Sequence, residues 1–545
     1  MDKAKKILYR HPWCLVIVII LLGVGIKVFL LITDRLPFNA DEAVVGLMAT
    51  HILRGELPIF YYGQSYMGSL DALLVAGMFV VFGKSVVAIR IIQILLFCGT
   101  LATTYLLAFR LTGKIEAGWI AVLLMAIPTV NLTLYSMISL GGYGEALFLG
   151  NLILFLGIWV IQKREWYAFL LLGLLAGFGL WVNGLTLVFS IPVIALLLWK
   201  RLQKGEAAHR NKIQSGLFLI LIGGLLGAMP WWFYGFQNGF DSLVAELFGS
   251  AISNTEVGYF TSLGLRLVSF VIFGMTVIFG LRPPWEIRWL VLPLIPLIVA
   301  IWVFILIGFR KLVRNIPELA DSGFLLGGVM VTTMAGFILT PFGNDPSGRY
   351  FLPFCVPLAI IAGIYLTNMQ SHLQNWRWVI LALLAAYNLG GIIQCWQKTP
   401  PGFTTQFDAT TIYDHSYTDE LIVFLQSNSI TRGYTTYWIS YPLAFLSDEK
   451  LIFIPRLPYH SDFGYTERDD RYPAYDNLVA AANDIGYITA RQPWLDSYLI
   501  DRFNEHGIKW QEKTIGDFTI FYNLQRVILP QEIGLGKSTE ENINE

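Results

Sequence analysis

Residues 34–58 read DRLPFNADEAVVGLMATHILRGELP, and they begin where the first long apolar run of the chain ends. Two adjacent carboxylates, Asp41 and Glu42, therefore lie close in sequence to a segment long enough to cross a membrane. A carboxylate near hydrocarbon loses hydration, which costs free energy. One interpretation is structural, because Asn39 or Asp41 can cap the helix that follows. The other interpretation is chemical, a base placed at the membrane surface.

The composition of the whole chain is that of a polytopic membrane protein. Of its 545 residues 55% are hydrophobic and only 14% are charged, whereas about a quarter are charged in a soluble domain. The formal net charge of zero conceals a split, since residues 401–545 hold 21 acids and 11 bases and residues 1–400 hold 17 acids and 27 bases. We therefore expect a membrane domain over residues 1–400 and an acidic soluble domain over residues 401–545.

The apolar runs predict a mostly α fold, with about 11–13 membrane spans and a small C-terminal α/β extramembrane domain. The expected spans lie at residues 13–33, 86–109, 116–138, 145–162, 217–236, 264–281, 289–309, 322–341, 350–368 and 377–396. Within the first span, Lys27 is expected to extend toward the membrane surface. The run 167–199 is interrupted by WVNG and is expected to form two helices. The basic loops leave one crossing within residues 217–309 unassigned, so the number of spans stays a range.

The N-terminus carries four basic residues before the first span, which predicts that it lies in the cytoplasm. The loop over residues 34–84 is then external. Within this loop, residues 67–83 are apolar but short and contain Asp71, so we expect an interfacial or re-entrant helix there. The domain after residue 400 is expected on the same external face.

After residue 400 the pattern changes to an alternation of helices and strands, which is typical of a small α/β domain. Helices are expected at residues 419–430 and 494–507, and strands at residues 432–439, 450–455, 485–490 and 517–524. The chain from about residue 534 is rich in polar residues and is expected to be disordered.

Aromatic residues follow the acidic pair. The helix expected after Asp41 has apolar spacing that suits the membrane interface, and it carries His51 near its end. Tyr62 and Tyr66 then lie among glycines in FYYGQSYMGS (60–69). These tyrosines either form an aromatic belt at the membrane surface or stack on the face of a sugar ring.

Two further polar clusters lie at the ends of spans. SLGGYGEA (139–146) contains Tyr143 and Glu145, and an acid at a helix start is favoured electrostatically. GNDPSGRYFLPF (343–354) contains Arg349 and Tyr350 immediately before a span. The arginine either anchors the helix end or holds a lipid phosphate, because its planar fork matches phosphate oxygens.

Taken together, these stretches resemble the GT-C membrane glycosyltransferases, and in particular the protein O-mannosyltransferases and the aminoarabinose transferases of lipid A. Members of this family carry an Asp-Glu pair after the first span, here Asp41 and Glu42. A phenylalanine-glycine turn then precedes an arginine-bearing span, here FGKS (82–85) and Arg90. GRYFLPFCVPLAI (348–360) is similar to the later arginine-tyrosine-proline segment of the family, and GGYGEALFLG resembles its second external loop.

The resemblance implies transfer of a sugar, with inversion, from a polyprenyl-phosphate donor at the external membrane face. It makes Asp41 the expected general base, while Glu42 orients the loop or helps to bind a cation, and Glu145 is a further catalytic candidate. The residues expected to bind the donor phosphate are Arg349, Tyr350 and Arg90. Those expected to contact the sugar or the acceptor are His51, Tyr62, Tyr66 and Tyr143.

The implied partners are membrane lipid, the polyprenyl-phosphate sugar donor and a lipid, glycan or protein acceptor, with no nucleic acid. No nucleotide-binding glycine loop is evident, so we expect neither a nucleotide nor a redox cofactor, whereas a divalent cation at Glu42 stays open. The expected location is the bacterial inner membrane. Two other classes remain as alternatives, a transporter or flippase of lipid-linked sugars, which would bury charges at mid-bilayer, and a non-catalytic membrane scaffold.

Overall fold

The computed structural model describes residues 12–203, 207–250, 258–370, 373–398, 402–460 and 463–536. Contacts divide the chain into two compact units. Unit 1 comprises Met1–Asp34, Tyr66–Asp71 and Arg90–Lys398, and unit 2 comprises Arg35–Ser65, Ala72–Ile89 and Thr399–Glu545. Most of the first loop therefore groups with the C-terminal residues, whereas the sequence division placed it with the membrane domain.

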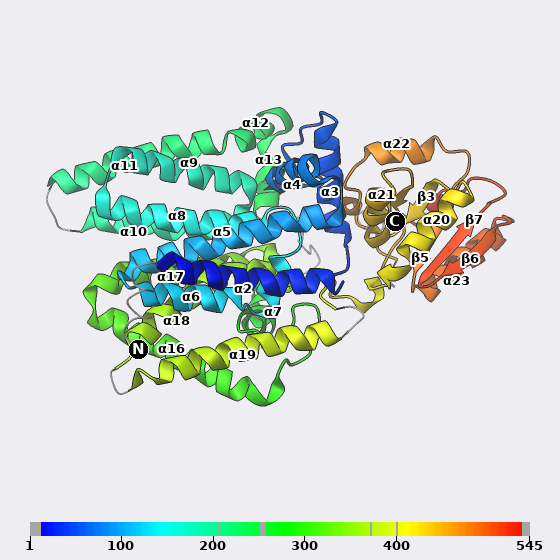
Figure 1. Cartoon of the computed structure of the whole chain (residues 1–545). Helices are drawn as coiled ribbons and strands as arrows, with labels where there is room; N and C mark the ends of the chain where they lie inside the picture. Colours follow the sequence, from blue (N-terminus) through cyan, green and yellow to red (C-terminus); the bar gives the residue numbers. More distant parts are fainter. Residues whose placement is uncertain are drawn as a thin grey trace. The chain divides into compact units, whose positions relative to one another are not determined.

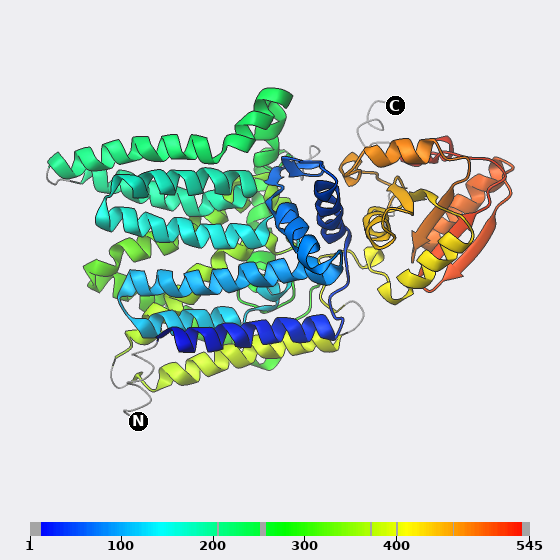
Figure 2. The same cartoon turned by 45° about the horizontal axis from the view of Figure 1, so that its top comes forward.

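Unit 1 is a bundle of long apolar helices (Figures 1 and 2). Within the described residues, nine helices are long and apolar enough to cross a membrane, or ten if the bent pair α11–α12 forms one span. Their bounds are α2 Pro12–Ile32, α5 Val86–Thr112, α8 Tyr143–Lys163, α10 Leu187–Leu202 with the preceding turn, α14–α15 Tyr259–Ile278, α16 Ile295–Asn315, α17 Ala320–Leu339, α18 Cys355–Thr367 with the preceding turn, α19 Trp376–Gln397, and the pair α11 Ala207–Gly227 and α12 Met229–Asn238.

The expected 11–13 spans exceed this number because three apolar helices are shorter, namely α4 Leu70–Phe82, α6 Ile115–Ala126 and α9 Trp166–Val182. The span expected at residues 116–138 is interrupted after α6, where Pro128 precedes the short helix α7 (Val130–Tyr135). The 13 residues of α4 reach about 20 Å, less than the hydrocarbon thickness of about 30 Å. The two helices expected within residues 167–199 are confirmed as α9 and α10, which meet at Asn183.

Helices α9 and α11 lie side by side in both views (Figures 1 and 2). Glycines allow their backbones to approach closely, since a Cβ atom added at Gly173 would lie 2.2 Å from the carbonyl oxygen of Ile220. A Cβ atom at Gly227 would lie 2.1 Å from the carbonyl oxygen of Leu174. In a membrane, where lipid tails remove the hydrophobic drive between helices, such close contact is what holds helices together.

Lys27 does not extend to the membrane surface, so that expectation is wrong. Its side chain is 1% exposed. The ammonium group donates hydrogen bonds to the backbone oxygen and the hydroxyl of Ser136, and it lies 4.0 Å from the centroid of the Phe97 ring. The carbonyl end of α7 carries partial negative charge, and it provides inside the bundle the acceptors that a lysine otherwise finds in water.

The C-terminal residues of unit 2 form a five-stranded sheet with helices, which confirms the expected α/β character (Figure 1). The strand order is β4-β3-β5-β7-β6, with β4, β3 and β5 parallel and β7 and β6 antiparallel to their neighbours. The strands are β3 Arg432–Thr435, β4 Ile452–Pro455, β5 Gly486–Ala490, β6 Gln511–Ile515 and β7 Phe518–Tyr522, and the helices are α20 Thr418–Ser427, α21 Tyr437–Leu446, α22 Ala474–Ala480 and α23 Pro493–Glu505. The disordered tail expected from about residue 534 lies, from residue 537 on, outside the described residues.

The strand expected at residues 432–439 is wrong in its second half, because α21 begins at Tyr437. As a helix, residues 437–446 can pack one face on the sheet and another face on α3. Ile439 and Leu443 belong to the core of the sheet. Phe445 packs against α3 (Ala40–Leu53), where a Cβ atom added at Gly46 would lie 2.5 Å from its ring. This packing is one reason why the first loop belongs to unit 2.

Candidate active site

The start of α3 decides between the two interpretations of the acidic pair. Asn39 is the N-cap, because its Oδ1 accepts a hydrogen bond of 2.9 Å from the backbone nitrogen of Glu42. Asp41 is therefore not the residue that caps the helix. Glu42 is fully buried, whereas the Asp41 side chain is partly exposed. The capping role belongs to Asn39, and the position of Asp41 needs another explanation.

The Asp41 carboxylate is held by a tyrosine from the C-terminal residues of unit 2. The hydroxyl of Tyr437 donates a hydrogen bond to Asp41 Oδ1, and the hydroxyl of Tyr61 donates one of 3.0 Å to the Asp41 backbone oxygen. Burial and the neighbouring Asp41 charge raise the pKa of Tyr437 well above its ordinary value. Tyr437 thus keeps its proton and remains a donor toward Asp41 at any physiological pH.

Behind Tyr437 lies the buried guanidinium of Arg471. It is 5.4 Å from the centroid of the Tyr437 ring, a cation–π distance. With the Gln64 amide oriented so that its oxygen faces the guanidinium, Arg471 donates two hydrogen bonds of 2.8 Å to it. Burial raises the pKa of the neighbouring Asp469 to about 7, although the Arg471 charge opposes this, and the Asp41 charge adds to the rise. Asp41 is thus surrounded by tyrosines, one arginine and a second acid.

His51 and Tyr62, two expected sugar or acceptor contacts, lie together in unit 2. The imidazole Nδ1 is 3.0 Å from the Tyr62 hydroxyl, and Nε2 is 2.9 Å from Glu449 Oε1. Tyr62 stacks on Tyr472 at 4.9 Å between ring centroids, so one of the two faces expected to stack on a sugar is covered. Burial opposes ionisation of Glu449, but hydrogen bonds from His51 and Tyr475 outweigh it and lower the pKa to about 2.

A second cluster, in unit 1, gathers four of the expected residues. The guanidinium carbon of Arg349 lies 5.3 Å from the centroid of the Tyr350 ring and 5.9 Å from that of Tyr143. Tyr66 is close enough to interact electrostatically with all three. Asp345, four residues before Arg349, accepts a hydrogen bond of 2.9 Å from its Nε and a second bond from Nη2. This Arg349 cluster combines a cation with three aromatic rings.

The backbone before Arg349 is fixed by α7. The side-chain amide of Asn131 donates to the Gly348 oxygen at 3.1 Å, and the Tyr135 hydroxyl donates to the Ser347 oxygen at 2.6 Å. Gly348 has φ +94°, and a Cβ atom there would lie 2.3 Å from Asn131 Oδ1. The glycine of the GRY motif is therefore required by both its conformation and its neighbour.

An apolar cavity of about 440 Å³ adjoins the Arg349 cluster, because Tyr66 and Tyr350 belong to both. The rest of its wall comes from α10, α13 (Phe240–Leu247), α17 and the turn at Phe342. The lining side chains are Tyr66, Asn183, Leu185, Leu187, Val188, Ile191, Leu247, Phe248, Thr332, Thr333, Phe337, Leu339, Thr340, Phe342 and Tyr350. A cavity with mostly apolar walls and a few polar groups at one side suits an amphiphilic ligand.

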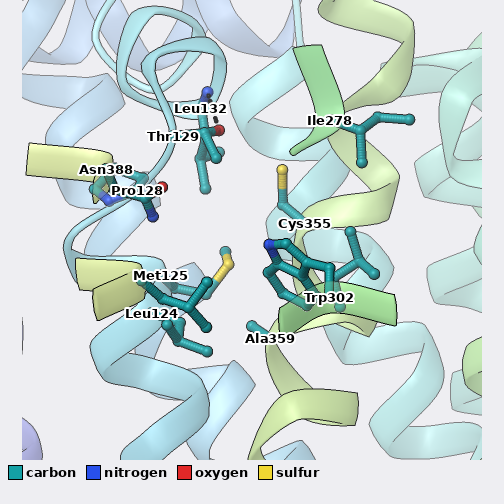
Figure 3. Close-up of a pocket in the computed structure, with 12 residues that line it drawn as sticks. Leu124, Met125, Pro128, Thr129, Leu132, Ile278, Trp302, Cys355, Ala359 and Asn388 are labelled. Carbon is teal, nitrogen blue, oxygen red and sulfur yellow. Dashed lines mark hydrogen bonds between the residues drawn. The ribbon is translucent and has the colours of Figure 1, made fainter. Parts of the chain in front are cut away.

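Figure 3 shows a different and much smaller cavity of about 40 Å³, at the break between α6 and α7. Pro128, Thr129, Trp302, Cys355 and Asn388 are among the side chains that line it. This volume holds water-sized molecules, but it is too small for a sugar or a lipid chain. Of these two cavities, the one beside Tyr350 has the volume for a lipid chain.

Glu145 lies beside a buried acid that the sequence analysis did not assign to the site. Asp71 accepts hydrogen bonds from Gln93 Nε2 at 3.0 Å, from the Ser139 hydroxyl at 2.6 Å and from the Gly141 nitrogen at 3.2 Å. Glu145 is 1% exposed and interacts electrostatically with Asp71. Asp71 thus fastens the glycine turn that precedes Tyr143. Arg90 is also buried, in the first turns of α5, and its role as a phosphate ligand stays a prediction.

One contact of the two clusters has a signal in the sequence, whereas others have none. Asp345 precedes Arg349 by four residues, a spacing at which an acid and a base can pair. Arg471 closes the charged run ERDDR (467–471), which reads as a solvated surface, yet it is 8% exposed. Tyr437 lies in a segment with a strand-like pattern and gives no signal. Within the part of the chain that the structure describes, no group of three or more His, Cys, Asp or Glu side chains is placed to hold a metal ion.

The fold is similar to that of two solved membrane proteins. ArnT from Cupriavidus metallidurans bound to undecaprenyl phosphate superposes with a TM-score of 0.57 and 11% identity, over 94% of this chain and 98% of that one. The oligosaccharyltransferase AglB from Archaeoglobus fulgidus, in complex with an inhibitory peptide and a dolichol-phosphate, gives a TM-score of 0.50 and 14% identity, over 91% of this chain and 71% of that one. No family model and no curated protein matches the chain.

Identity this low shows the fold alone. The protein is a multi-pass helical membrane protein with a fold like those of ArnT and AglB and a small C-terminal α/β part, which confirms the expected fold class.

Proposed function

We propose that the protein is an inverting glycosyltransferase that moves a sugar from a polyprenyl-phosphate donor to a lipid, glycan or protein acceptor. The observation that carries the proposal is the Arg349 cluster beside the apolar cavity of about 440 Å³. A cation whose aromatic neighbours Tyr66 and Tyr350 line an apolar cavity matches a lipid that ends in a phosphate. Two proteins of the same fold have been solved with such lipids, undecaprenyl phosphate and dolichol-phosphate.

Arg349 is the proposed ligand of the donor phosphate. Asp345 engages Nε and Nη2 of the guanidinium and so fixes its plane. The Nη1 side of the fork is not bonded to Asp345 and is directed to the phosphate oxygens in this proposal. Tyr350 and Tyr66 line both the cluster and the cavity, so their rings would cover the junction between phosphate and hydrocarbon. Tyr143 and Arg90 are proposed to assist on the donor side.

Asp41 is the proposed general base. The acceptor oxygen attacks the anomeric carbon of the donor while the bond between that carbon and the phosphate oxygen breaks. The acceptor proton passes to the Asp41 carboxylate, and the bonding electrons leave with the polyprenyl phosphate, which inverts the anomeric centre. His51 and Tyr62 are proposed acceptor contacts, and Glu42 is proposed to orient the start of α3. The proposed reaction does not require a divalent cation, and a cation at Glu42 stays a prediction.

The proposed location is the bacterial inner membrane, with the N-terminus in the cytoplasm and the residues after 400 on the external side. The charge split between residues 1–400 and 401–545 supports this orientation. Labelling of single introduced thiols from either side of the membrane tests it, and labelling of the C-terminal residues only from the cytoplasm would contradict it.

The test of the proposed function uses the full-length protein in proteoliposomes. Undecaprenyl-phosphate-linked hexose and pentose donors are supplied one at a time with lipid, glycan and peptide acceptors, and released undecaprenyl phosphate is measured. We expect release with at least one donor and acceptor pair, together with a sugar of inverted configuration on the acceptor. Movement of intact donor between leaflets without cleavage would instead identify a flippase, and neither reaction with any pair would contradict the proposal.

A further inference from the structure

Asp41 is contacted by groups that lie outside its own helix, α3. α3 fixes the backbone of Asp41, and Tyr61 bonds its carbonyl oxygen at 3.0 Å. Neither contact restrains the carboxylate. The hydrogen bond that does so comes from Tyr437, 396 residues later in the chain, on the first residue of α21.

Tyr437 itself is held from two sides. Its side chain is 3% exposed, and its ring packs on Tyr441 at 5.5 Å between centroids and on the Arg471 guanidinium at 5.4 Å. Arg471 is in turn anchored by Gln64 on β2 (Gln64–Gly68). The phenol hydroxyl therefore has little rotational freedom, and the orientation of the Asp41 carboxylate follows from it.

The two oxygens of Asp41 are not equivalent. Oδ1 accepts the Tyr437 hydroxyl, whereas no hydrogen bond to Oδ2 is found among the described residues. The Asp41 residue as a whole is partly exposed. A proton acceptor works best when its geometry is set before the substrate arrives, and a hydrogen bond to one carboxylate oxygen sets the direction of the other.

We propose that Tyr437 is the positioning residue of Asp41, and that Arg471 positions Tyr437. The proposal rests on the proposed function, because it assumes that Asp41 accepts the acceptor proton. In this arrangement the residues after 400 take part in the reaction, since they direct Oδ2. The groups that interact with Asp41 are Tyr437 from α21, Tyr61 from β1 (Phe60–Tyr61), Tyr459 from the loop after β4, and Arg471 and Asp469 from the loop before α22.

The test is the steady-state kinetics of undecaprenyl phosphate release by the full-length protein carrying Tyr437→Phe. This change keeps the ring and its contact with Arg471 and removes only the hydroxyl. Loss of the hydrogen bond leaves the Asp41 carboxylate free to rotate, so kcat should fall by roughly 10-fold. The KM for the donor should stay unchanged.

Two control variants separate this role from a structural one. Tyr61→Phe removes a hydrogen bond to the backbone oxygen of Asp41, and it should leave kcat unchanged. Tyr487→Phe removes a buried hydrogen bond of 2.6 Å to the Ile528 oxygen elsewhere in unit 2, and it should lower thermal stability without changing kcat.

A wild-type kcat in a folded Tyr437→Phe would overturn the proposal. If that variant does not fold, Arg471→Gln provides the second measurement, because loss of the guanidinium frees the Tyr437 ring and should lower kcat at unchanged donor KM, and an unchanged kcat again overturns the proposal. Asp41→Asn separates the proposed function from the role of Tyr437. Full activity of Asp41→Asn contradicts the proposed function, whereas an inactive Asp41→Asn beside a wild-type kcat in Tyr437→Phe contradicts only the role of Tyr437.

Discussion

The Arg349 cluster and the surroundings of Asp41 are built in opposite ways. Arg349 is paired with Asp345 four residues earlier and lies beside the ring of the next residue, Tyr350. Asp41 is bonded to Tyr437, 396 residues later. The first arrangement is largely present in one short motif, whereas the second exists only because two distant segments fold into one unit. A short motif can therefore reveal the local partners of one candidate residue, whereas the group that orients another candidate is visible only in the folded chain.

The two regions also differ in chemical character, because one adjoins an apolar cavity and the other is polar. The Arg349 cluster adjoins a mostly apolar cavity, so its cation and rings match an amphiphilic lipid. Asp41 is surrounded by tyrosine hydroxyls, Arg471 and Asp469, which bind through hydrogen bonds and charge. If the comparison is correct, substitutions around Arg349 should change donor affinity, and substitutions around Asp41 should change turnover.

The largest effect is expected from Asp41→Asn. Because Asn39 is the N-cap, asparagine at position 41 leaves the cap of α3 in place, but an amide cannot accept the acceptor proton. Turnover should fall by on the order of 10²–10⁴-fold, the usual contribution of a positioned acid–base group, at unchanged thermal stability. The measurement is undecaprenyl phosphate release under single-turnover conditions.

Glu42→Gln is the matched control for this prediction, and it should reduce turnover less if Glu42 only orients the loop. A near wild-type rate for Asp41→Asn would show that Asp41 is not the general base, and Glu145 would then be the next candidate.

Arg349→Ala should weaken binding of undecaprenyl phosphate, measured by native mass spectrometry or by displacement from nanodiscs. Loss of a charge-assisted phosphate contact costs about 1.5–3 kcal/mol, which corresponds to roughly 10–150-fold in Kd. Turnover at saturating donor should change less than affinity. Lys398→Ala removes a half-exposed cation of the same unit and should leave Kd unchanged. Equal affinity of Arg349→Ala and the wild type would refute the phosphate role.

The His51 and Glu449 pair should contribute to stability, in addition to the proposed contact of His51 with the acceptor. The Glu449 pKa of about 2 in the folded protein lies below the usual value of about 4.3. The pair therefore stabilises unit 2 above pH 4.3, and this contribution is lost as pH falls toward 2. Glu449→Gln should lower Tm by roughly 3–10 °C at pH 7. The difference from wild type should shrink at pH 3.

The exposed Glu512 provides the control for this pH dependence, because Glu512→Gln should change Tm at neither pH. A Tm difference for Glu449→Gln that persists undiminished at pH 3 would show that packing, and not the ionised carboxylate, is responsible.

The smallest effect is expected from Asn39→Ala. Loss of an N-cap side chain costs about 1 kcal/mol, so hydrogen exchange of the first turn of α3 should accelerate about five-fold. Asn39→Asp should preserve protection, because aspartate caps as well as asparagine. Acceleration of the whole unit by Asn39→Ala, instead of the first turn alone, would show that this cap supports more than its helix.

Much of the fold could be predicted from sequence because it depends on local signals. Long apolar runs set the membrane helices, and WVNG, with Asn183 at its centre, correctly divided α9 from α10. Short runs rich in apolar and β-branched residues set β4, β5 and β7. Pro128 is also a local signal, because a proline interrupts a helix, and it lies at the break between α6 and α7. The motifs GGYGEA and GRYF singled out Tyr143, Arg349 and Tyr350, whose side chains the structure brings together.

What the tertiary structure alone decided has one physical cause. Periodicity shows whether a side chain is buried, but it does not show which distant group will meet it. Lys27 can be buried because the carbonyl end of α7 accepts its hydrogen bonds. Residues 437–446 are helical because a helix lets them pack on both the core of the sheet and α3. The sequence by itself determined the membrane class, the elements and the motif around Arg349. Only folding brought Tyr437 to Asp41, because a hydrogen bond across 396 residues leaves no trace in any local pattern.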